Sequence, residues 1–167
     1  MANLEKDLKL NLRQTFLFST LAWVMVAIFG SLPFLLSNQL FSFSDAFFES
    51  MSGITTTGAT IISDLDNSPK SILLWRAIMQ WLGGIGIVVM AITILPLLKV
   101  GGMQLFKMEG PDTTEKILPR TIEVAAIIIS TYIVLTLFCG FFYWAFGMTF
   151  FDSVCHAMTT IATGGFS

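Results

Sequence analysis

Charged residues are scarce in this chain. Lysine, arginine, aspartate and glutamate make up 12% of its 167 residues, about half the share found in soluble proteins. The net charge is −2 and no basic cluster with interleaved aromatic residues occurs, so we expect no nucleic-acid partner. The two cysteines, Cys139 and Cys155, have neither CxxC nor Cys/His spacing. We therefore expect no transition-metal site and no cofactor.

Long hydrophobic runs are what the chain has in abundance, and hydrophobic residues make up 54% of it. Three runs are long enough to cross a bilayer: residues 15–36, 68–98 and 121–146. Polar segments precede the first run (1–14) and separate the second from the third (99–120). The pattern predicts an all-α integral membrane protein that crosses the membrane several times.

The distribution of lysine and arginine predicts the orientation. Residues 1–14 carry three of these basic residues and residues 99–120 carry four, whereas residues 37–70 carry one and residues 147–167 carry none. Basic residues accumulate on the cytoplasmic side of membrane proteins. We therefore expect the N-terminal segment and the 99–120 linker to be cytoplasmic.

Between the first two runs lies the polar stretch Ser-Gly-Ile-Thr-Thr-Thr-Gly-Ala-Thr, residues 52–60. Three consecutive β-branched threonines disfavour a helix, and the flanking glycines allow backbone angles that other residues resist. Non-helical backbone at membrane depth is tolerated where it lines a watery pathway. Its carbonyl and hydroxyl oxygens could replace the hydration shell of an alkali cation. The alternative is an extracellular turn between two helices.

A second copy of this pattern favours the pathway. A shift of 107 positions places several residues on identical ones, in the same order. The matching residues are Phe43, Asp45, Met51, Ile54, Thr56 and Gly58 on Phe150, Asp152, Met158, Ile161, Thr163 and Gly165. A chance polar turn would not repeat its context in this way.

Each copy begins with a short helix that has a Ser/Thr-x-x-Asp start, at residues 42–53 and 149–160. A helix of this length spans about 18 Å, which reaches only mid-membrane. The sequence therefore predicts two re-entrant pore loops, 42–60 and 149–167, entering from outside. The first belongs to a complete helix–loop–helix repeat (15–98), and the second to the start of another repeat (121–167).

Other polar residues offer weaker candidates for chemistry. Asp152, Ser153 and His156 could suggest a hydrolase, but no second base or oxyanion donor accompanies them, so we expect no enzyme. We expect Glu49 and His156, on the two short helices, to brace the loops or reach outer water. Arg76 is expected to extend to the outer lipid headgroups. The glycines of residues 83–86 are expected to allow close helix packing.

Four segments together resemble one family of cation transporters, the Trk/Ktr/HKT superfamily, and in particular its Trk-type bacterial potassium uptake subunits. These segments are Phe47 to Thr60, Gln80 to Gly86, Gly101 to Leu105 and Thr163 to Ser167. The resemblance implies four helix–pore-loop–helix repeats around one pathway, with one filter glycine in each repeat. Gly58 and Gly165 are the matching positions.

The resemblance also implies ligands and partners. Backbone oxygens of the two loops would bind K⁺, the transported ion, with Ala59 and Phe166 at the outer rim. The implied filter residues are Thr56, Thr57, Gly58, Ala59, Thr163, Gly164, Gly165 and Phe166. Membrane lipid, a second copy of the full-length parent and a cytoplasmic nucleotide-binding regulatory subunit are the implied partners. The implied location is the bacterial cytoplasmic (inner) membrane.

The chain resembles only the first repeat and the opening of the second. We therefore expect a fragment or truncated product of a longer transporter, and the fold to be an incomplete version of a K⁺-channel-like one. The leading hypothesis is the pore-forming part of a potassium uptake transporter. The alternative is a non-conducting membrane scaffold or assembly subunit derived from the same repeat.

Overall fold

The computed structural model describes residues 12–37, 42–98 and 117–167. Five helices follow one another in these residues. They are α1 (Leu12–Leu36), α2 (Phe43–Ile54), α3 (Lys70–Leu98), α4 (Ile117–Ala145) and α5 (Phe150–Ile161). The predicted N-terminal segment and linker lie largely outside the described residues. The all-α membrane fold predicted from the sequence is confirmed.

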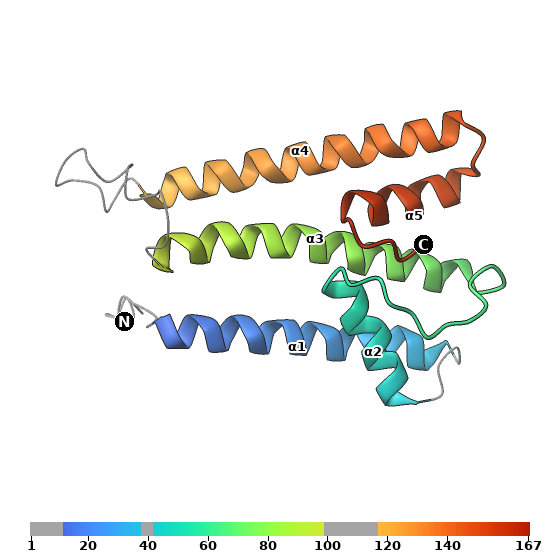
Figure 1. The fold of residues 1–167 in the computed structure, drawn as a ribbon, viewed down its shortest axis with the longest axis horizontal. Coiled ribbons are helices and arrows are strands. Elements are labelled where there is room, and N and C mark those ends of the chain that lie inside the picture. Colours follow the sequence, from blue (N-terminus) through green and yellow to red (C-terminus); the bar gives the residue numbers. More distant parts are fainter. Residues whose placement is uncertain (1–11, 38–41, 99–116) are drawn as a thin grey trace, which may run out of the picture.

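Three helices, α1, α3 and α4, are long and apolar enough to cross a membrane. They lie side by side and alternate in direction, so that the start of α1, the end of α3 and the start of α4 share one end (Figure 1). Their apolar stretches are 24, 22 and 23 residues long, and about 20 residues suffice to span the hydrocarbon. One membrane can therefore hold all three.

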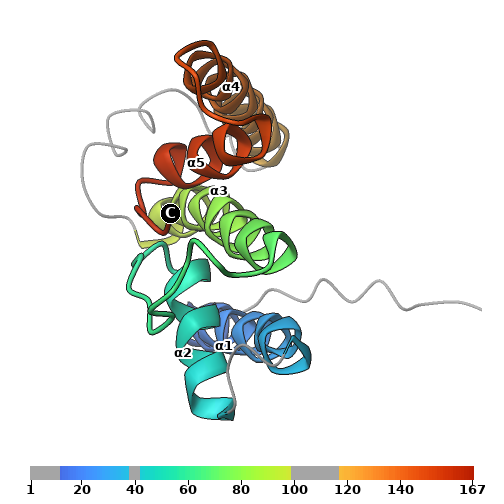
Figure 2. The same ribbon diagram turned by 90° about the vertical axis from the view of Figure 1, so that its right-hand side faces the viewer.

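The short helices α2 and α5 lie beside the long helices, at the end opposite to the start of α1 (Figures 1 and 2). Each begins at the far end of a long helix and runs back toward the middle, and the chain then reverses again (Figure 1). The N-cap hydroxyls of Ser42 and Thr149 accept hydrogen bonds from the backbone N–H groups of Ser44 and Asp152. These caps satisfy donors that the first turn of a helix leaves free. The re-entrant course agrees with the prediction, and both helices begin and end within one residue of it.

Helix α3 is the centre of the arrangement, because α1 and α2 pack on one side of it and α4 and α5 on the other (Figure 2). Its glycines permit this close packing, as the sequence predicted. A Cβ at Gly83 would collide with the backbone carbonyl of Ile54. A Cβ at Gly84 would lie 2.6 Å from the Tyr132 hydroxyl oxygen of α4. Small residues at these points let helix backbones approach each other.

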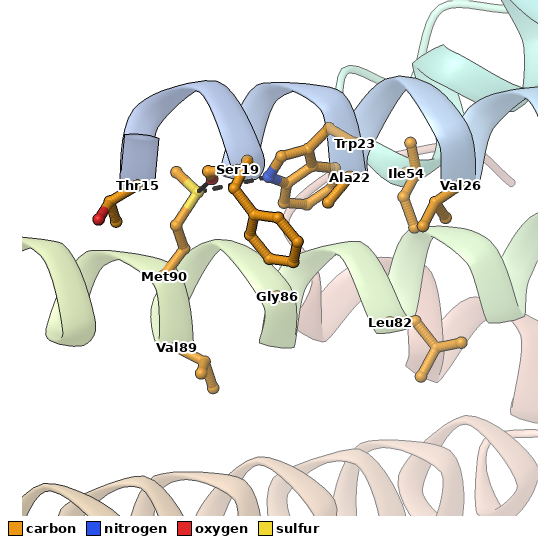
Figure 3. Close-up of a pocket in the computed structure, with 11 residues that line it drawn as sticks. Thr15, Ser19, Ala22, Trp23, Val26, Ile54, Leu82, Gly86, Val89 and Met90 are labelled. Carbon is orange, nitrogen blue, oxygen red and sulfur yellow. Dashed lines mark hydrogen bonds between the residues drawn. The ribbon is translucent and has the colours of Figure 1, made fainter. Parts of the chain in front are cut away.

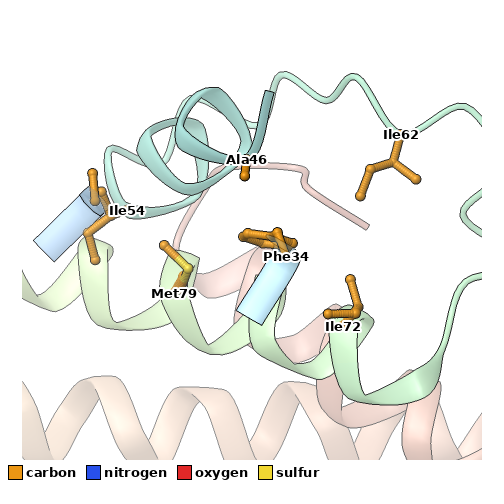
Figure 4. Packing of buried hydrophobic residues seen from close by; sticks show 7 residues of the cluster. Phe34, Ala46, Ile54, Ile62, Ile72 and Met79 are labelled. Carbon is orange, nitrogen blue, oxygen red and sulfur yellow. The ribbon is translucent and has the colours of Figure 1, made fainter. Parts of the chain in front are cut away.

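A hydrophobic cluster fixes α2 against α1 and α3 (Figure 4). It contains buried residues from all three helices and from the segment after α2. They are Ala27, Phe34, Ala46, Ile54, Ile62, Ile72 and Met79. Close van der Waals packing of these side chains holds the short helix in place, because helix association in a membrane has no hydrophobic driving force.

Beyond the tip of α2, α1 and α3 separate and leave an apolar crevice of about 450 Å³ (Figure 3). The hydroxyl of Ser19 and the indole N–H of Trp23 both donate to the Met90 sulfur across it, at 2.8 and 3.3 Å. Ile54 closes one end of the crevice. At this crevice, α1 and α3 are therefore joined by a few side-chain contacts rather than by continuous packing.

Two of the long helices begin three or more residues before the start predicted from the sequence. Helix α1 begins at Leu12 rather than at Thr15. Helix α4 begins at Ile117 rather than at Thr121, so Pro119, which was assigned to the linker, lies in its first turn. Proline is compatible with a first helical turn because the N–H groups there have no intrahelical acceptor.

Candidate functional site

The chain reverses at the end of α2 through a short turn, which opens loop one (residues 55–60). The N–H groups of Thr55, Thr56 and Thr57 donate to the carbonyls of Met51, Gly53 and Ser52 at 3.0 Å each. Thr56 has a φ of 57° and Gly58 a φ of 76°. A left-handed angle is costly for a β-branched residue and free for glycine. The run of threonines is thus non-helical, as predicted.

Loop two (residues 162–167) repeats this turn at an offset of 107 residues. The N–H groups of Ala162, Thr163 and Gly164 donate to carbonyls at the corresponding positions of α5, at 3.2, 2.9 and 3.2 Å. Thr163 has a φ of 58° and Gly165 a φ of 63°. Both the hydrogen-bond pattern and the two left-handed residues coincide. The sequence repeat is therefore also a repeat of backbone geometry.

The two loops touch each other beside the middle of α3 (Figures 1 and 2). A Cβ built on Gly58 would collide with the carbonyl oxygen of Gly164. Gly58 therefore needs to be glycine for two reasons, its left-handed φ and the opposing backbone. The ends of α2 and α5 both lead into the loops, so the negative ends of both helix dipoles favour a cation nearby.

Loop one is held by Glu49, a residue of its own short helix. The two carboxylate oxygens of Glu49 accept hydrogen bonds from the Thr60 hydroxyl at 2.8 Å and from the Ile61 N–H at 3.1 Å. Arg76 of α3 donates from Nε to the same carboxylate at 2.8 Å. Glu49 and Arg76 are 0% and 2% exposed. The expectation that Glu49 braces the loop is confirmed.

The expectation for Arg76 was wrong. The side chain does not extend to the outer headgroups, because α2 and loop two close over it. Its guanidinium carbon lies 3.9 Å from the centre of the Phe166 ring, in cation–π geometry. A buried carboxylate, rather than lipid phosphate, neutralises its charge.

Loop two is held by α3 as well as by its own helix, α5, whose Thr159 hydroxyl bonds to the Ser167 hydroxyl at 2.7 Å. The N–H of Phe166 donates to Oε1 of Gln80 at 3.2 Å, and Gln80 is fully buried. The Phe166 ring is also buried and packs between Arg76 and Gly53. The outer-rim position expected for Phe166 stays a prediction. Its side chain points into the protein and anchors loop two to the first half of the chain.

The whole chain, residues 1–167, matches the family model TrkH, described as a cation transport protein. The chain belongs to the TrkH family. It is 49% identical over 154 residues to the Trk system potassium uptake protein TrkI of Halomonas elongata, covering 92% of this chain and 31% of that protein. It is 48% identical over 162 residues to TrkH of Vibrio parahaemolyticus, covering 95% of this chain and 33% of that protein.

A solved structure shows the same architecture. The crystal structure of the potassium transporter TrkH from Vibrio parahaemolyticus superposes with a TM-score of 0.80 at 43% sequence identity. The match covers 99% of this chain and 32% of that one. The chain thus spans about a third of the length of the relatives it matches. The resemblance to Trk-type proteins stated from the sequence is confirmed.

The structure places the expected filter residues of this TrkH-family chain in different surroundings, and Thr56 is half-buried in the turn of loop one. Gly58 and Gly164 meet at the contact between the loops, and Thr57, Ala59, Thr163 and Gly165 are exposed beside it. The carbonyl oxygen of Ala59 accepts from the Ser52 hydroxyl at 2.6 Å, so this oxygen points toward α2. The side chain of Phe166 is directed away from the loops' exposed surface.

Sequence reasoning missed Gln80, which supports loop two, and Ser52, which binds loop one. A signal for Gln80 was present: an amide in the middle of an apolar helix must find a hydrogen-bond partner in the membrane. Its partner could not be read from the sequence because the two residues lie 86 positions apart.

The residues that could suggest a hydrolase are not arranged as one. Ser153 donates its hydroxyl to the Thr149 carbonyl at 2.7 Å, and the Thr149 hydroxyl donates to Asp152 at 2.6 Å. Nδ1 of His156 is buried and has no hydrogen-bond partner. Among the residues whose placement the structure gives, no three His, Cys, Asp or Glu side chains could share a metal ion. The family and the named relatives are transport proteins, which fits the expectation that the chain is not an enzyme.

Proposed function

We propose that this chain is the pore-forming part of a potassium uptake transporter and that its two loops supply half of an ion filter. K⁺ would be coordinated by the backbone oxygens of Thr56, Thr57, Thr163 and Gly164. Ala59 and Phe166 would lie at the outer end. The observation that carries the proposal is the contact of two backbone turns of the same geometry, at Gly58 and Gly164.

The chemistry of the loops suits a large monovalent cation. Backbone carbonyls are neutral, hard oxygen ligands that can replace the hydration shell of K⁺ without binding it too tightly to leave. Among the described residues, the charged pair beside the loops is Glu49 and Arg76, which is neutral as a unit and is buried between α2 and α3. A fixed negative charge in the pathway is thus not required, and the two helix dipoles contribute the remaining attraction.

The proposed arrangement in the membrane follows the basic residues. The N-terminal segment (1–14) and the linker (99–120) would be cytoplasmic, and both loops would enter from outside, in a bacterial inner membrane. Residues 15–98 would form one repeat and residues 121–167 the start of the next. Lipid would contact α4, whose apolar span is not buried inside the chain. A homodimer and a cytoplasmic nucleotide-binding subunit are proposed for a full-length transporter on resemblance alone.

A chimaera tests the function. This chain would replace the matching third of Vibrio parahaemolyticus TrkH, to which it is 48% identical. In a bacterial strain without potassium uptake, we expect the chimaera to restore growth at low K⁺. We also expect membrane vesicles that contain the chimaera to take up radioactive Rb⁺, and excess Na⁺ should not suppress this uptake. A chimaera that reaches the membrane and assembles but neither restores growth nor carries Rb⁺ would support the scaffold alternative and exclude the filter.

A further inference from the structure

We infer that Gln80 is a positioning residue for loop two, and that this α3 side chain helps to set ion selectivity although it lies outside the loop. The inference rests on the proposed potassium function of the same loops. It concerns a residue that does not touch the ion and acts through the backbone at Gly164 and Phe166.

The side-chain amide of Gln80 contacts both Phe166 and Gly164. Oε1 of Gln80 accepts the N–H of Phe166 at 3.2 Å, which fixes the orientation of the amide because a donor requires an acceptor. The other end, Nε2, then lies against Gly164, where an added Cβ would collide with Nε2 and Cδ and lie 2.9 Å from Cγ. Gln80 therefore touches the residues on both sides of Gly165. In Figure 1 the C-terminal segment, which contains loop two, lies along α3.

The two neighbouring glycines are thus needed for different reasons. Gly165 has a φ of +63°, and an added Cβ would meet no atom within 4 Å, so its requirement is conformational. Gly164 is outside the left-handed region, so its φ does not require glycine. What excludes a side chain at position 164 is the amide of Gln80.

The consequence reaches the place where the loops meet. The carbonyl oxygen of Gly164 is the atom that faces Gly58 of loop one. A shift of Gln80 would therefore change the distance between the two loops and the direction of a proposed ion ligand. Helix α5 offers no counterpart of Glu49, because His156 occupies that position and its unpartnered Nδ1 does not bind the loop. The contact of α5 with loop two through the Thr159 and Ser167 hydroxyls lies at the last residue and does not involve Gly164.

The first test is Gln80→Met in the chimaera, a change that keeps the length of the side chain and removes the acceptor. We expect normal amounts of protein in the membrane and a loss of K⁺ over Na⁺ preference of about five- to tenfold, the equivalent of one hydrogen bond. The matched control is Tyr132→Phe, which removes the hydrogen bond from the Tyr132 hydroxyl to the α3 carbonyl of Trp81. The control should keep its selectivity.

The second test does not depend on how well the first variant folds. Gly164→Ala should reduce Rb⁺ uptake strongly, because the new Cβ meets Gln80. Adding Gln80→Ala frees that space, so Gln80→Ala/Gly164→Ala should carry more Rb⁺ than Gly164→Ala alone, although its selectivity should stay poor. The effects of the two substitutions would then be non-additive, as expected for residues in contact.

The outcomes separate this inference from the proposed function. If the unmodified chimaera carries no K⁺, the filter proposal and this inference both fall. If it is K⁺-selective but Gln80→Met keeps that selectivity, or Tyr132→Phe loses it equally, the inference alone is overturned. An additive combination of Gly164→Ala and Gln80→Ala would likewise remove Gln80 as the reason for glycine at position 164.

Discussion

Loop one and loop two have the same backbone geometry but are supported in different ways. Loop one is held from within its own half of the chain, by Glu49 and Ser52 of α2. Loop two is held mainly from the other half, by Gln80 of α3 and by the packing of Phe166 on Arg76, with one hydroxyl contact from Thr159 of α5 to Ser167. A repeat can therefore conserve the turn that presents carbonyl oxygens while the residues behind the turn diverge. The difference also makes loop two dependent on the first half of the chain.

The largest expected difference concerns the two loop glycines that correspond in the repeat, Gly58 and Gly165. Gly58 and Gly165 both have left-handed φ angles, but only Gly58 faces an opposing carbonyl. Alanine at either position costs about 1–2 kcal/mol of backbone strain. At Gly58 the opposing loop must also move, so Gly58→Ala should lower Rb⁺ uptake by the chimaera at least about tenfold more than Gly165→Ala.

The same comparison can be made for selectivity. Gly58→Ser should weaken K⁺ preference and let Na⁺ compete, because the serine side chain crowds the carbonyl of Gly164. Growth at low K⁺ with added Na⁺ measures this effect. Equal uptake by the Gly58 and Gly165 variants, with unchanged Na⁺ sensitivity, would mean that the contact between the loops does not form part of the pathway.

A second difference should be seen in stability. Glu49→Gln removes the charge that neutralises buried Arg76, and an uncompensated buried charge costs about 3–5 kcal/mol. His156→Ala changes the corresponding residue of α5, which makes no hydrogen bond through Nδ1. We expect Glu49→Gln to lower the melting temperature of the detergent-solubilised chimaera by several degrees and His156→Ala to change it little.

Potassium uptake by the chimaera is the second measurement for the Glu49 and His156 variants. His156→Ala should leave uptake largely intact, as expected for a residue that holds no part of loop two. Loss of uptake in a normally expressed His156→Ala protein would assign His156 a function. A Glu49→Gln protein as stable as the unmodified one would show that Arg76 is neutralised in another way.

Much of the fold could be predicted from the sequence because the relevant signals are local. The lengths of the apolar runs, the caps at Ser42 and Thr149, and the 107-residue repeat determine which segments cross the membrane and which turn back. The left-handed turns were signalled by threonine and glycine in a stretch that could neither form a good helix nor cross lipid. These features depend on residues close together in the chain.

The supports of the loops could not be predicted in the same way. Whether Arg76 extends to lipid or pairs with Glu49 depends on where α2 packs, and this is decided by the hydrophobic cluster around Phe34 and Met79. Two opposite charges in apolar helices were the available signal, since each is costly in a membrane unless paired. For Gln80 and Phe166, only the approach of loop two to α3 reveals the contact.

The smallest expected difference is between two hydroxyls at corresponding positions. Ser52 donates to the carbonyl oxygen of Ala59 at 2.6 Å, whereas the Thr159 hydroxyl bonds to the Ser167 hydroxyl at 2.7 Å. Ser52→Ala should therefore release a loop carbonyl, and Thr159→Val should not.

The loss of one such hydrogen bond is worth about 1 kcal/mol, which corresponds to roughly a fivefold change in an equilibrium. We expect a change of this size in the K⁺ concentration for half-maximal uptake with Ser52→Ala, and less than about a twofold change with Thr159→Val. A larger effect of Thr159→Val would contradict this expectation. It would mean that the side-chain contact of Thr159 with Ser167 positions loop two more strongly than the contact of Gln80 with the Phe166 N–H. The two loops would then be supported in more similar ways than their hydrogen bonds indicate.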